Sequence, residues 1–197
     1  MRTLTQSLLS LRTCAVVALV SACTTTTLPP ADRAYTGRFS ATTSLGEQRQ
    51  SVSGRFSFEI RGATQRLELS SPLGTTVARI DIDPDGARAT GMQMQEVRGP
   101  DADALTEQLL GWPLPVSGLI EWIEGRPVPH RAARIEREAG RATLIEQDGW
   151  SIRLPEYFDT PRRPRRLVLE RAALAEAPAV TLRLVLDEPT VSELTEK

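Results

Sequence analysis

Apolar and polar residues alternate along most of this chain, and a period of two residues is typical of β-strands that bury one face. The alternation is clearest between Val52 and Ile60, where Phe56 and Phe58 fall on the same face. Shorter runs of this kind occur at residues 39–41, 67–69, 78–82, 87–89, 92–94, 133–135, 142–144, 150–154, 167–169 and 180–186. Gly, Pro and Asp residues separate the runs, so the pattern predicts an antiparallel meander of about ten or eleven strands.

Two stretches in the middle of the chain change to the period of an α-helix. Residues 101–110 begin with an aspartate, which is a preferred helix cap, and a glycine follows them. In residues 111–127, Leu119, Trp122 and Ile123 have the spacing of one apolar face of a short helix. Prolines and a glycine around this face fit the two ends of that helix. On the residues alone, such a helix is an ordinary part of a core.

A sheet of this size has to curl, and helices over one of its openings would enclose a concave apolar space. An apolar space suits an apolar ligand. Met92 and Met94 would suit such a space, because methionine side chains adapt to different ligand shapes. The same apolar residues could instead fill a solid core, and the pattern is compatible with both arrangements.

The first residues resemble the leader of a bacterial lipoprotein. Basic residues precede an uncharged apolar run at residues 14–20, and Val20-Ser21-Ala22-Cys23 resembles a lipobox. The run is too short to cross a bilayer as a helix. We expect residues 1–22 to be removed as a signal peptide and Cys23 to carry acyl chains, whose methylene groups each contribute about 0.8 kcal/mol when buried in a membrane.

The residues after this cysteine predict where the protein is held. In the enterobacterial sorting scheme that this leader resembles, an aspartate after the cysteine favours the inner membrane, so Thr24 favours the outer membrane. Residues 23–34 are rich in Thr and Pro and read as a lipidated tether that cannot form a core. Residues 35–197 would then form one domain, anchored by lipid to the outer membrane and facing the periplasm.

Composition and charge restrict the class of protein further. The chain has 197 residues, 40% of them hydrophobic, which fits a single compact domain. Its formal net charge is -1, so no excess of positive charge is present to neutralise a nucleic acid. One histidine and two cysteines cannot form a Cys/His metal cluster.

One group of acidic residues resembles the first half of a calcium-binding loop. Asp81, Asp83, Asp85 and Gly86 have the spacing of such a loop. Its twelfth position needs a bidentate glutamate, and Met92 stands there instead. We therefore interpret this group as a turn between two strands, and we expect neither a metal nor a cofactor.

Several motifs together resemble one protein family. They are the lipobox ending at Cys23, Ser71-Pro72-Leu73-Gly74 between two strands, Gly111-Trp112-Pro113-Leu114-Pro115 leading into residues 119–127, Trp150 at the start of a strand, and Pro164 before residues 167–169. In this order and spacing they resemble the LolB family of outer-membrane lipoprotein receptors. The resemblance extends over nearly the whole chain.

The resemblance implies a mainly β fold, an unclosed antiparallel β-barrel with a helical lid over a hydrophobic cavity. It implies that a LolA-like periplasmic carrier hands lipoproteins to this chain and that the cavity holds their acyl chains. The lipoproteins would then enter the inner leaflet of the outer membrane, each acceptor binding them more favourably than the donor. The family needs no cofactor, and we expect a monomer.

The resemblance also implies roles for particular residues. Leu73 matches an exposed leucine that aids insertion in the family, and a lone apolar side chain between Pro72 and Gly74 could enter a bilayer leaflet. Alternatively, Leu73 could fold back onto the core. The residues expected at the acyl-chain cavity or its lid are Phe56, Phe58, Met92, Met94, Leu119, Trp122, Ile123 and Trp150.

Other interpretations of the same residues remain open. The chain could be a non-catalytic envelope lipoprotein that binds other lipids or partner proteins. It could be an esterase with His130 as its base, but no Gly-x-Ser-x-Gly elbow occurs in the chain, so we expect no enzyme. The arginine-rich segment at residues 161–166 could be a solvated loop, or it could dock an acidic rim of the carrier or phospholipid headgroups.

Overall fold

The computed structural model describes residues 31–189, apart from positions 93, 111, 113 and 175–176. The expected signal peptide and Cys23 lie outside the described residues. The strands are β1 (Arg33–Leu45), β2 (Gln48–Arg61), β3 (Thr64–Ser70), β4 (Thr76–Asp83), β5 (Gly86–Gly91), β6 (Met94–Gly99), β7 (Ala133–Glu138), β8 (Arg141–Gln147), β9 (Trp150–Tyr157), β10 (Pro164–Arg171) and β11 (Ala179–Leu186). The helices are α1 (Ala102–Leu110) and α2 (Val116–Ile123). Strand β1 thus begins within the segment that we expected to be tether.

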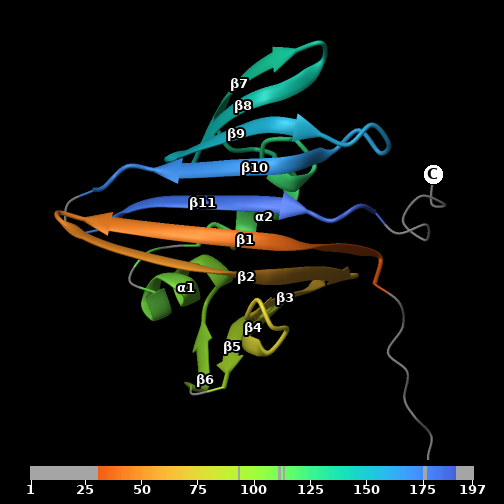
Figure 1. Cartoon of the computed structure of the whole chain (residues 1–197). Coiled ribbons are helices and arrows are strands. Elements are labelled where there is room, and N and C mark those ends of the chain that lie inside the picture. Colours follow the sequence, from red (N-terminus) through yellow and green to blue (C-terminus); the bar gives the residue numbers. More distant parts are fainter. Residues whose placement is uncertain (1–30, 93, 111, 113, 175–176, 190–197) are drawn as a thin grey trace, which may run out of the picture.

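All the strands belong to one antiparallel sheet with the order β6-β5-β4-β3-β2-β1-β11-β10-β9-β8-β7 (Figure 1). Almost every neighbour in the sheet is also a neighbour in the chain. The exception is the pairing of β1 with β11, which brings the first and last strands together in the middle of the sheet. Strands β6 and β7 are its two edges and do not pair with each other, so the prediction of an unclosed antiparallel sheet of about eleven strands is confirmed.

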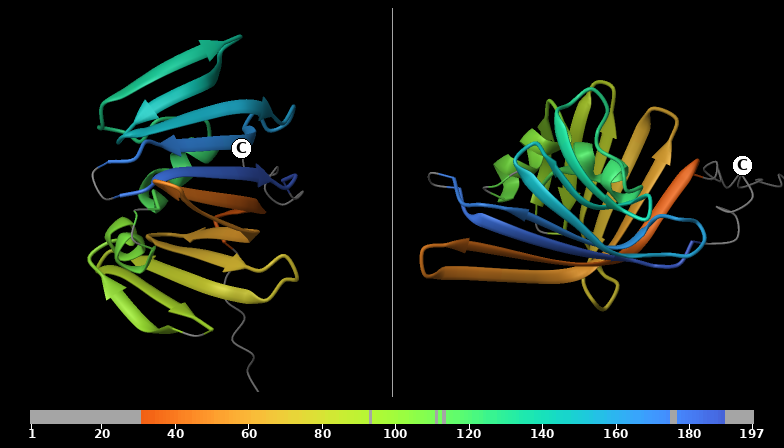
Figure 2. Two further views of the ribbon diagram at one scale, coloured as in Figure 1. Left: turned by 60° about the vertical axis from the view of Figure 1, so that its left-hand side comes forward. Right: turned by 90° about the horizontal axis from the view of Figure 1, so that it is seen from above.

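The chain crosses from one edge of the sheet to the other through the two helices, which lie between β6 and β7 in sequence. Both helices lie on the same side of the curved sheet (Figure 2). Helix α1 contacts β5 and β6 and continues into α2. The two predicted helices are therefore the connection that covers the concave face. In the described part of the chain, no helix is long and apolar enough to cross a membrane.

From Gly54 onward, the period-two alternation of β2 places the core as predicted, whereas Val52 at the start of the run is 59% exposed. Phe56, Phe58 and Ile60 of β2 are all buried, and the residues between them face outward. Phe56 lies directly opposite Gly37 on β1, and Phe39 lies opposite Gly54. A Cβ at Gly37 would come within 2.9 Å of the Phe56 ring and within 2.3 Å of a backbone carbonyl of β11. Glycine is therefore needed where the curved strands approach one another so closely.

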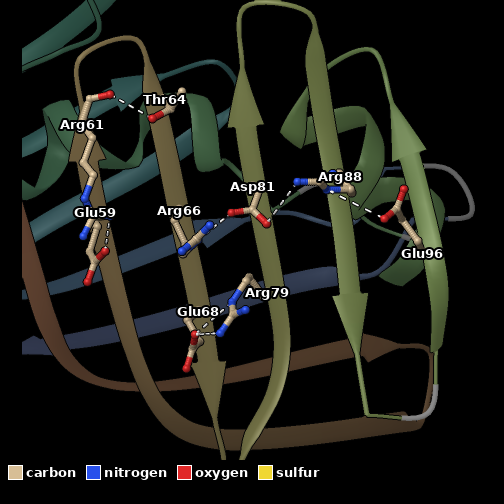
Figure 3. A network of polar contacts seen from close by, with 9 residues as sticks. All are labelled: Glu59, Arg61, Thr64, Arg66, Glu68, Arg79, Asp81, Arg88 and Glu96. Atoms are coloured by element: carbon tan, nitrogen blue, oxygen red, sulfur yellow. Dashed lines mark hydrogen bonds and ion pairs between the residues drawn. The ribbon is translucent and has the colours of Figure 1, made fainter. Parts of the chain in front are cut away.

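The outer face of β3 to β6 carries charged side chains that pair across the strands (Figure 3). Asp81 lies between Arg66, at 2.6 Å, and Arg88, at 3.8 Å. On the neighbouring row Arg79 lies 2.7 Å from Glu68. Such exposed pairs contribute at most about 1 kcal/mol each, so they add little to stability. They leave this half of the outer face nearly balanced in charge.

Candidate functional site

Helix α2 begins directly after Pro115 and ends at Ile123, as the sequence predicted. At its end, the backbone N–H of Gly125 donates to the carbonyl of Trp122 at 2.9 Å, and that of Arg126 donates to Glu121 at 2.8 Å. Gly125 has a φ of 72°, which favours glycine. This arrangement is the usual left-handed end of a helix, and it leaves Gly125 close to Tyr157 and Pro164 of the sheet.

Helix α2 is apolar on most of its circumference and is almost fully buried. Leu119 is 3% exposed, Trp122 is 1% exposed and Ile123 has no exposed surface. The buried residues Phe56, Phe58 and Trp150 belong to the same core cluster. Six of the eight predicted cavity and lid residues thus belong to one cluster, because a helix that is apolar on most sides must bury them. In this conformation the helix itself fills the concave side of the sheet.

One buried amide joins α2 to β8. Gln147 is 3% exposed, and its side-chain oxygen accepts hydrogen bonds from Trp122 Nε1 at 3.0 Å and from the Val128 backbone N–H at 2.8 Å. Its Nε2 donates to the carbonyl of Val128 at 3.0 Å. A single side chain therefore satisfies the indole of the helix and the backbone of the segment that follows it. We call Gln147 and Trp122 the indole latch.

A second polar contact joins the end of α2 to β1. The buried hydroxyl of Tyr35 donates to Glu124 Oε1 at 2.7 Å. The guanidinium of Arg163 lies over the Tyr35 ring, 5.2 Å from its centre. Burial and then the hydrogen bond to Glu124 raise the pKa of the Tyr35 hydroxyl above its ordinary value. Tyr35 is therefore held protonated, as a donor to the carboxylate.

The beginning of α2 is held by α1. Asp103 Oδ1 accepts the backbone N–H of Ser117 at 2.9 Å, and its Oδ2 accepts the hydroxyl of the same serine at 2.5 Å. The buried hydroxyl of Thr106 accepts the backbone N–H of Leu114 at 3.0 Å. Asp103 thus supplies a cap that Pro115 cannot provide. The two helices are joined to each other, whereas the end of α2 is joined to the sheet.

The predicted position of Met92 inside the cavity is wrong. Met92 lies in the turn between β5 and β6, and 68% of its surface is exposed. The alternation that began at Ala87 ends at Gly91, because β5 ends there. It therefore does not determine the direction of the Met92 side chain, which follows the strand. The side chain of Met94 lies outside the described part of the structure, so its place in the cavity stays a prediction.

Leu73 lies at the tip of the connection between β3 and β4. The backbone N–H of Gly74 donates to the carbonyl of Ser71 at 2.9 Å, which closes a tight turn with Pro72 at its favoured second position. The Ser71 N–H donates to the carbonyl of Thr75 at 2.8 Å. Leu73 is 96% exposed, so it does not fold back onto the core. The turn presents this side chain to the solvent in a defined geometry.

The arginine-rich segment does not form one cluster. Arg163 is buried against Tyr35, whereas Arg165 and Arg166 are exposed and lie 2.8 Å and 3.4 Å from Glu156. Arg163 lies just before β10, which begins at Pro164, and an irregular register between Pro164 and Val168 leaves the consecutive residues Arg165 and Arg166 both exposed. The prediction that all these arginines dock one partner is therefore wrong for Arg163.

A hollow of about 680 Å³ opens beside the turn between β8 and β9. Its lining includes Glu146, Asp148, Glu170 and Arg171. Charged groups of this kind make a poor environment for hydrocarbon chains, because charges would have to leave water when the chains enter. Trp150 also lines the hollow, but its charged groups do not fit the apolar cavity that the sequence predicted, and that cavity stays a prediction.

The described residues offer little for catalysis or metal binding. His130 lies in an exposed turn with a φ of 61°, and no hydrogen bond or ion pair joins it to another described residue. Asp83 and Gly86 form the ends of the turn between β4 and β5, as predicted, and Asp83 Oδ1 accepts the backbone N–H of Asp85 at 2.9 Å. Within the described ranges, no group of His, Cys, Asp and Glu could hold a metal ion.

Comparison with known proteins gives a consistent result. Residues 32–188 match the family model described as outer membrane lipoprotein LolB. The chain is 39% identical over 165 residues to the outer-membrane lipoprotein LolB of Cupriavidus pinatubonensis, covering 80% of this chain and 79% of the relative. It is 40% identical over 141 residues to that of Thiobacillus denitrificans, covering 71% and 72%.

One solved structure is also similar, although its sequence identity to this chain is low. The crystal structure of the LolA superfamily protein NE2245 from Nitrosomonas europaea aligns with a TM-score of 0.42 and 10% sequence identity. The alignment covers 83% of this chain and 90% of that chain.

Proposed function

Because the chain belongs to the LolB family of outer-membrane lipoproteins, we propose that it is a receptor that inserts other lipoproteins into the outer membrane. In this proposal Cys23 is acylated and holds the domain, through the tether, at the periplasmic side of that membrane. A LolA-like carrier delivers each lipoprotein. The chain holds its acyl chains and releases them into the inner leaflet, without catalysis.

The exposure of Leu73 is the observation that carries this proposal. A leucine that is 96% exposed leaves an apolar side chain in water, and its transfer into hydrocarbon contributes about 1.5 to 3 kcal/mol. The hydrogen-bonded turn from Ser71 to Gly74 already holds it in place, so little ordering is needed when it inserts. A single residue of this kind favours brief contact with a bilayer over permanent attachment.

The buried helix α2 supports the proposed acyl-chain site. Hydrocarbon chains could enter the concave side only if they replaced contacts that Leu119, Trp122 and Ile123 now make with the sheet. The exchange substitutes one apolar surface for another, so its apolar contribution to the free energy is small, and the buried hydrogen bonds of Trp122 and Tyr35 set most of its cost. We propose that α2 moves away from the sheet when cargo is bound, and that the indole latch and the Tyr35–Glu124 contact open with it.

The release step is tested by changing Leu73 to Glu, which puts a charge where hydrocarbon contact is needed. We expect the variant to accept cargo from the carrier normally but to retain it in the presence of outer-membrane vesicles. Leu174→Glu is the matched control, because Leu174 is also an exposed leucine in a connection, at 66%. Normal insertion of cargo by Leu73→Glu would exclude the proposed role of the turn.

The acyl-chain site is tested by photo-cross-linking. A photoreactive phenylalanine in place of Trp122 is expected to form an adduct with the acyl chains of bound cargo, and the same group at exposed Met92 is not. If cargo is bound and no adduct forms at position 122, the acyl chains lie elsewhere. That result would favour the alternative function, a non-catalytic envelope lipoprotein that binds other lipids or partner proteins.

A further inference from the structure

An open hollow of about 450 Å³ lies on the outer face of the sheet, where β1, β11, β10 and β9 run side by side. Three arginines from three strands line it, namely Arg38, Arg166 and Arg183. Arg38 lies opposite Val185, which in turn lies opposite Arg166. Because neighbouring strands are about 4.8 Å apart, the Cα atoms of Arg38 and Arg166 are roughly 10 Å apart. We call these three residues the arginine hollow.

The arginine hollow differs in charge from the rest of the outer face. The side chains of Arg38 and Arg183 make no hydrogen bond or ion pair within the described residues. Arg166 lies 3.4 Å from Glu156, but Arg165 shares that carboxylate at 2.8 Å. By contrast, the arginines on the outer face of β3 to β6 lie within 4.0 Å of a carboxylate; they are Arg66, Arg79, Arg88 and Arg98. Positive charge is therefore in excess around Arg38 and Arg183, whereas charge is nearly balanced on the outer face of β3 to β6.

The register of β1 and β2 adds a further positive charge beside the hollow. Arg38 lies directly opposite Arg55. Like charges in directly opposed positions destabilise a sheet, and Asp187, at 2.9 Å from Arg55, compensates only one of the two. An anionic ligand over Arg38 would relieve this repulsion. The arrangement therefore favours an anion that comes from outside the chain.

The hollow and Leu73 lie on the same side of the sheet. Ser70, the last residue of β3, is opposite Arg55, and Arg55 is opposite Arg38, so one row leads from the Leu73 turn to the hollow. Figure 2 shows the connection between β3 and β4 projecting away from the helices. Arg38 and Arg183 alternate with buried residues of β1 and β11, so they belong to the face opposite the helices. Across the row, the distance from Ser70 to Arg38 is about 10 Å.

We infer that the arginine hollow binds the phosphate groups of anionic phospholipids, so that the outer face of the sheet rests on the inner leaflet while Leu73 is inserted. Guanidinium groups bind phosphate through two parallel hydrogen bonds, and each arginine near an anionic surface contributes about 1 kcal/mol. The inference rests on the proposed membrane role of Leu73. Its consequence is an orientation that leaves α2 and the two open edges of the sheet facing the periplasm, where a carrier arrives.

The test uses the full-length lipidated chain in phosphatidylcholine vesicles with and without phosphatidylglycerol. A fluorophore on Thr181→Cys reports contact with a headgroup quencher, because Thr181 lies beside Arg183 on β11. The same fluorophore on Thr90→Cys of β5 reports the charge-balanced half of the sheet. We expect quenching at position 181 that requires phosphatidylglycerol and disappears at high salt, where the screening length falls to about 3 Å.

The decisive variant is Arg38→Gln/Arg183→Gln. We expect docking to weaken about thirtyfold, since each arginine contributes about fivefold. Arg98→Gln/Arg134→Gln removes the same charge from the exposed edges of the outer face and is expected to dock like the wild type. Equal quenching in all three chains, or quenching that does not depend on phosphatidylglycerol, would overturn the inference.

Two further outcomes separate this inference from the proposed function. If Arg38→Gln/Arg183→Gln docks normally but accepts cargo from the carrier more slowly, the hollow binds an acidic protein and the lipid assignment is wrong. Leu73→Glu could insert cargo normally while the wild type still shows quenching at position 181 that depends on phosphatidylglycerol. That result would exclude the proposed role of the turn and still support phospholipid binding by the arginine hollow. Quenching is measured without cargo, so it does not depend on transfer.

Discussion

Helix α2 and the turn between β3 and β4 contain the same kind of side chain in opposite environments. Leu119 on α2 is 3% exposed and Leu73 in the turn is 96% exposed. Both segments are short and bounded by proline and glycine. The helix buries its apolar surface within the chain and so contributes to folding, whereas the turn leaves its apolar surface available to a partner. Apolar side chains of the same kind thus complete the core in one segment and remain exposed to solvent in the other.

The polar contacts of the two segments also differ: those of the turn are local, and those of the helix join it to distant parts of the chain. The turn is closed by hydrogen bonds within its own residues 71–75. Helix α2 depends on distant partners, since Gln147 and Tyr35 hold its end and Asp103 holds its beginning. A change in the turn should therefore remain local. A change in the helix should affect the whole sheet, and the four variants below test this difference from the largest expected effect to the smallest.

The largest effect is expected for Trp122→Ala. Truncating a buried tryptophan typically costs about 3 to 5 kcal/mol, because contacts are lost and a cavity is left. The urea midpoint of unfolding measures this loss. Trp122→Phe, which keeps most of the volume, should cost much less. If Trp122→Ala lowers stability by under 1 kcal/mol, the helix does not complete the core.

Gln147→Leu should cost about 2 to 3 kcal/mol, because Trp122 Nε1 and the backbone of Val128 lose buried hydrogen-bond partners. Combining it with Trp122→Phe removes both sides of the indole latch. The double variant should then lose less than the sum of the single variants, as measured by urea unfolding. If the losses of the two single variants add up to the loss of the double variant, the hydrogen bond between Gln147 and Trp122 contributes no coupling energy.

Tyr35→Phe should cost about 1 kcal/mol at neutral pH through the lost hydrogen bond to Glu124. Because the pKa of Tyr35 is raised in the folded state, the wild type should lose stability as the pH rises above about 10, where only the unfolded chain ionises readily. Thermal unfolding at several alkaline pH values measures the slope. The variant should show a shallower decline.

Tyr157 provides the control for that slope, since burial also raises its pKa. It is the other of the two tyrosines in the chain. Part of the alkaline decline should therefore remain in Tyr35→Phe and disappear in Tyr35→Phe/Tyr157→Phe. If stability declines at alkaline pH as much in the double variant as in the wild type, groups other than the two tyrosines cause the decline.

The smallest effect on stability is expected for Leu73→Ala. An exposed substitution of this kind stays within about 0.5 kcal/mol, so the urea midpoint should not move. In the proposed function the same variant should still slow the insertion of cargo into vesicles. A large loss of stability would instead mean that Leu73 packs against the domain, and the contrast with Leu119 would fail.

Much of the fold could be predicted because its determinants are local. Alternation over a few residues identifies a strand, and the cap at Asp101 and the left-handed Gly125 mark helix ends. The turn that exposes Leu73 likewise depends on adjacent residues. The position of Met92 was missed because alternation stops where β5 stops, and the burial of Arg163 was missed because it packs against Tyr35, which is far away in the chain.

The sequence by itself thus determined the strands, the two helices, the family and the position of Leu73 in a turn, since each depends on neighbouring residues or on motifs in order, whereas the structure decided that Leu73 is exposed. Only the tertiary structure decided that β1 pairs with β11, that Gln147 holds Trp122, and that Arg38, Arg166 and Arg183 line one hollow. The physical reason is that these groups are far apart in the chain. They meet only when the antiparallel register of the sheet is set, which periodicity cannot specify.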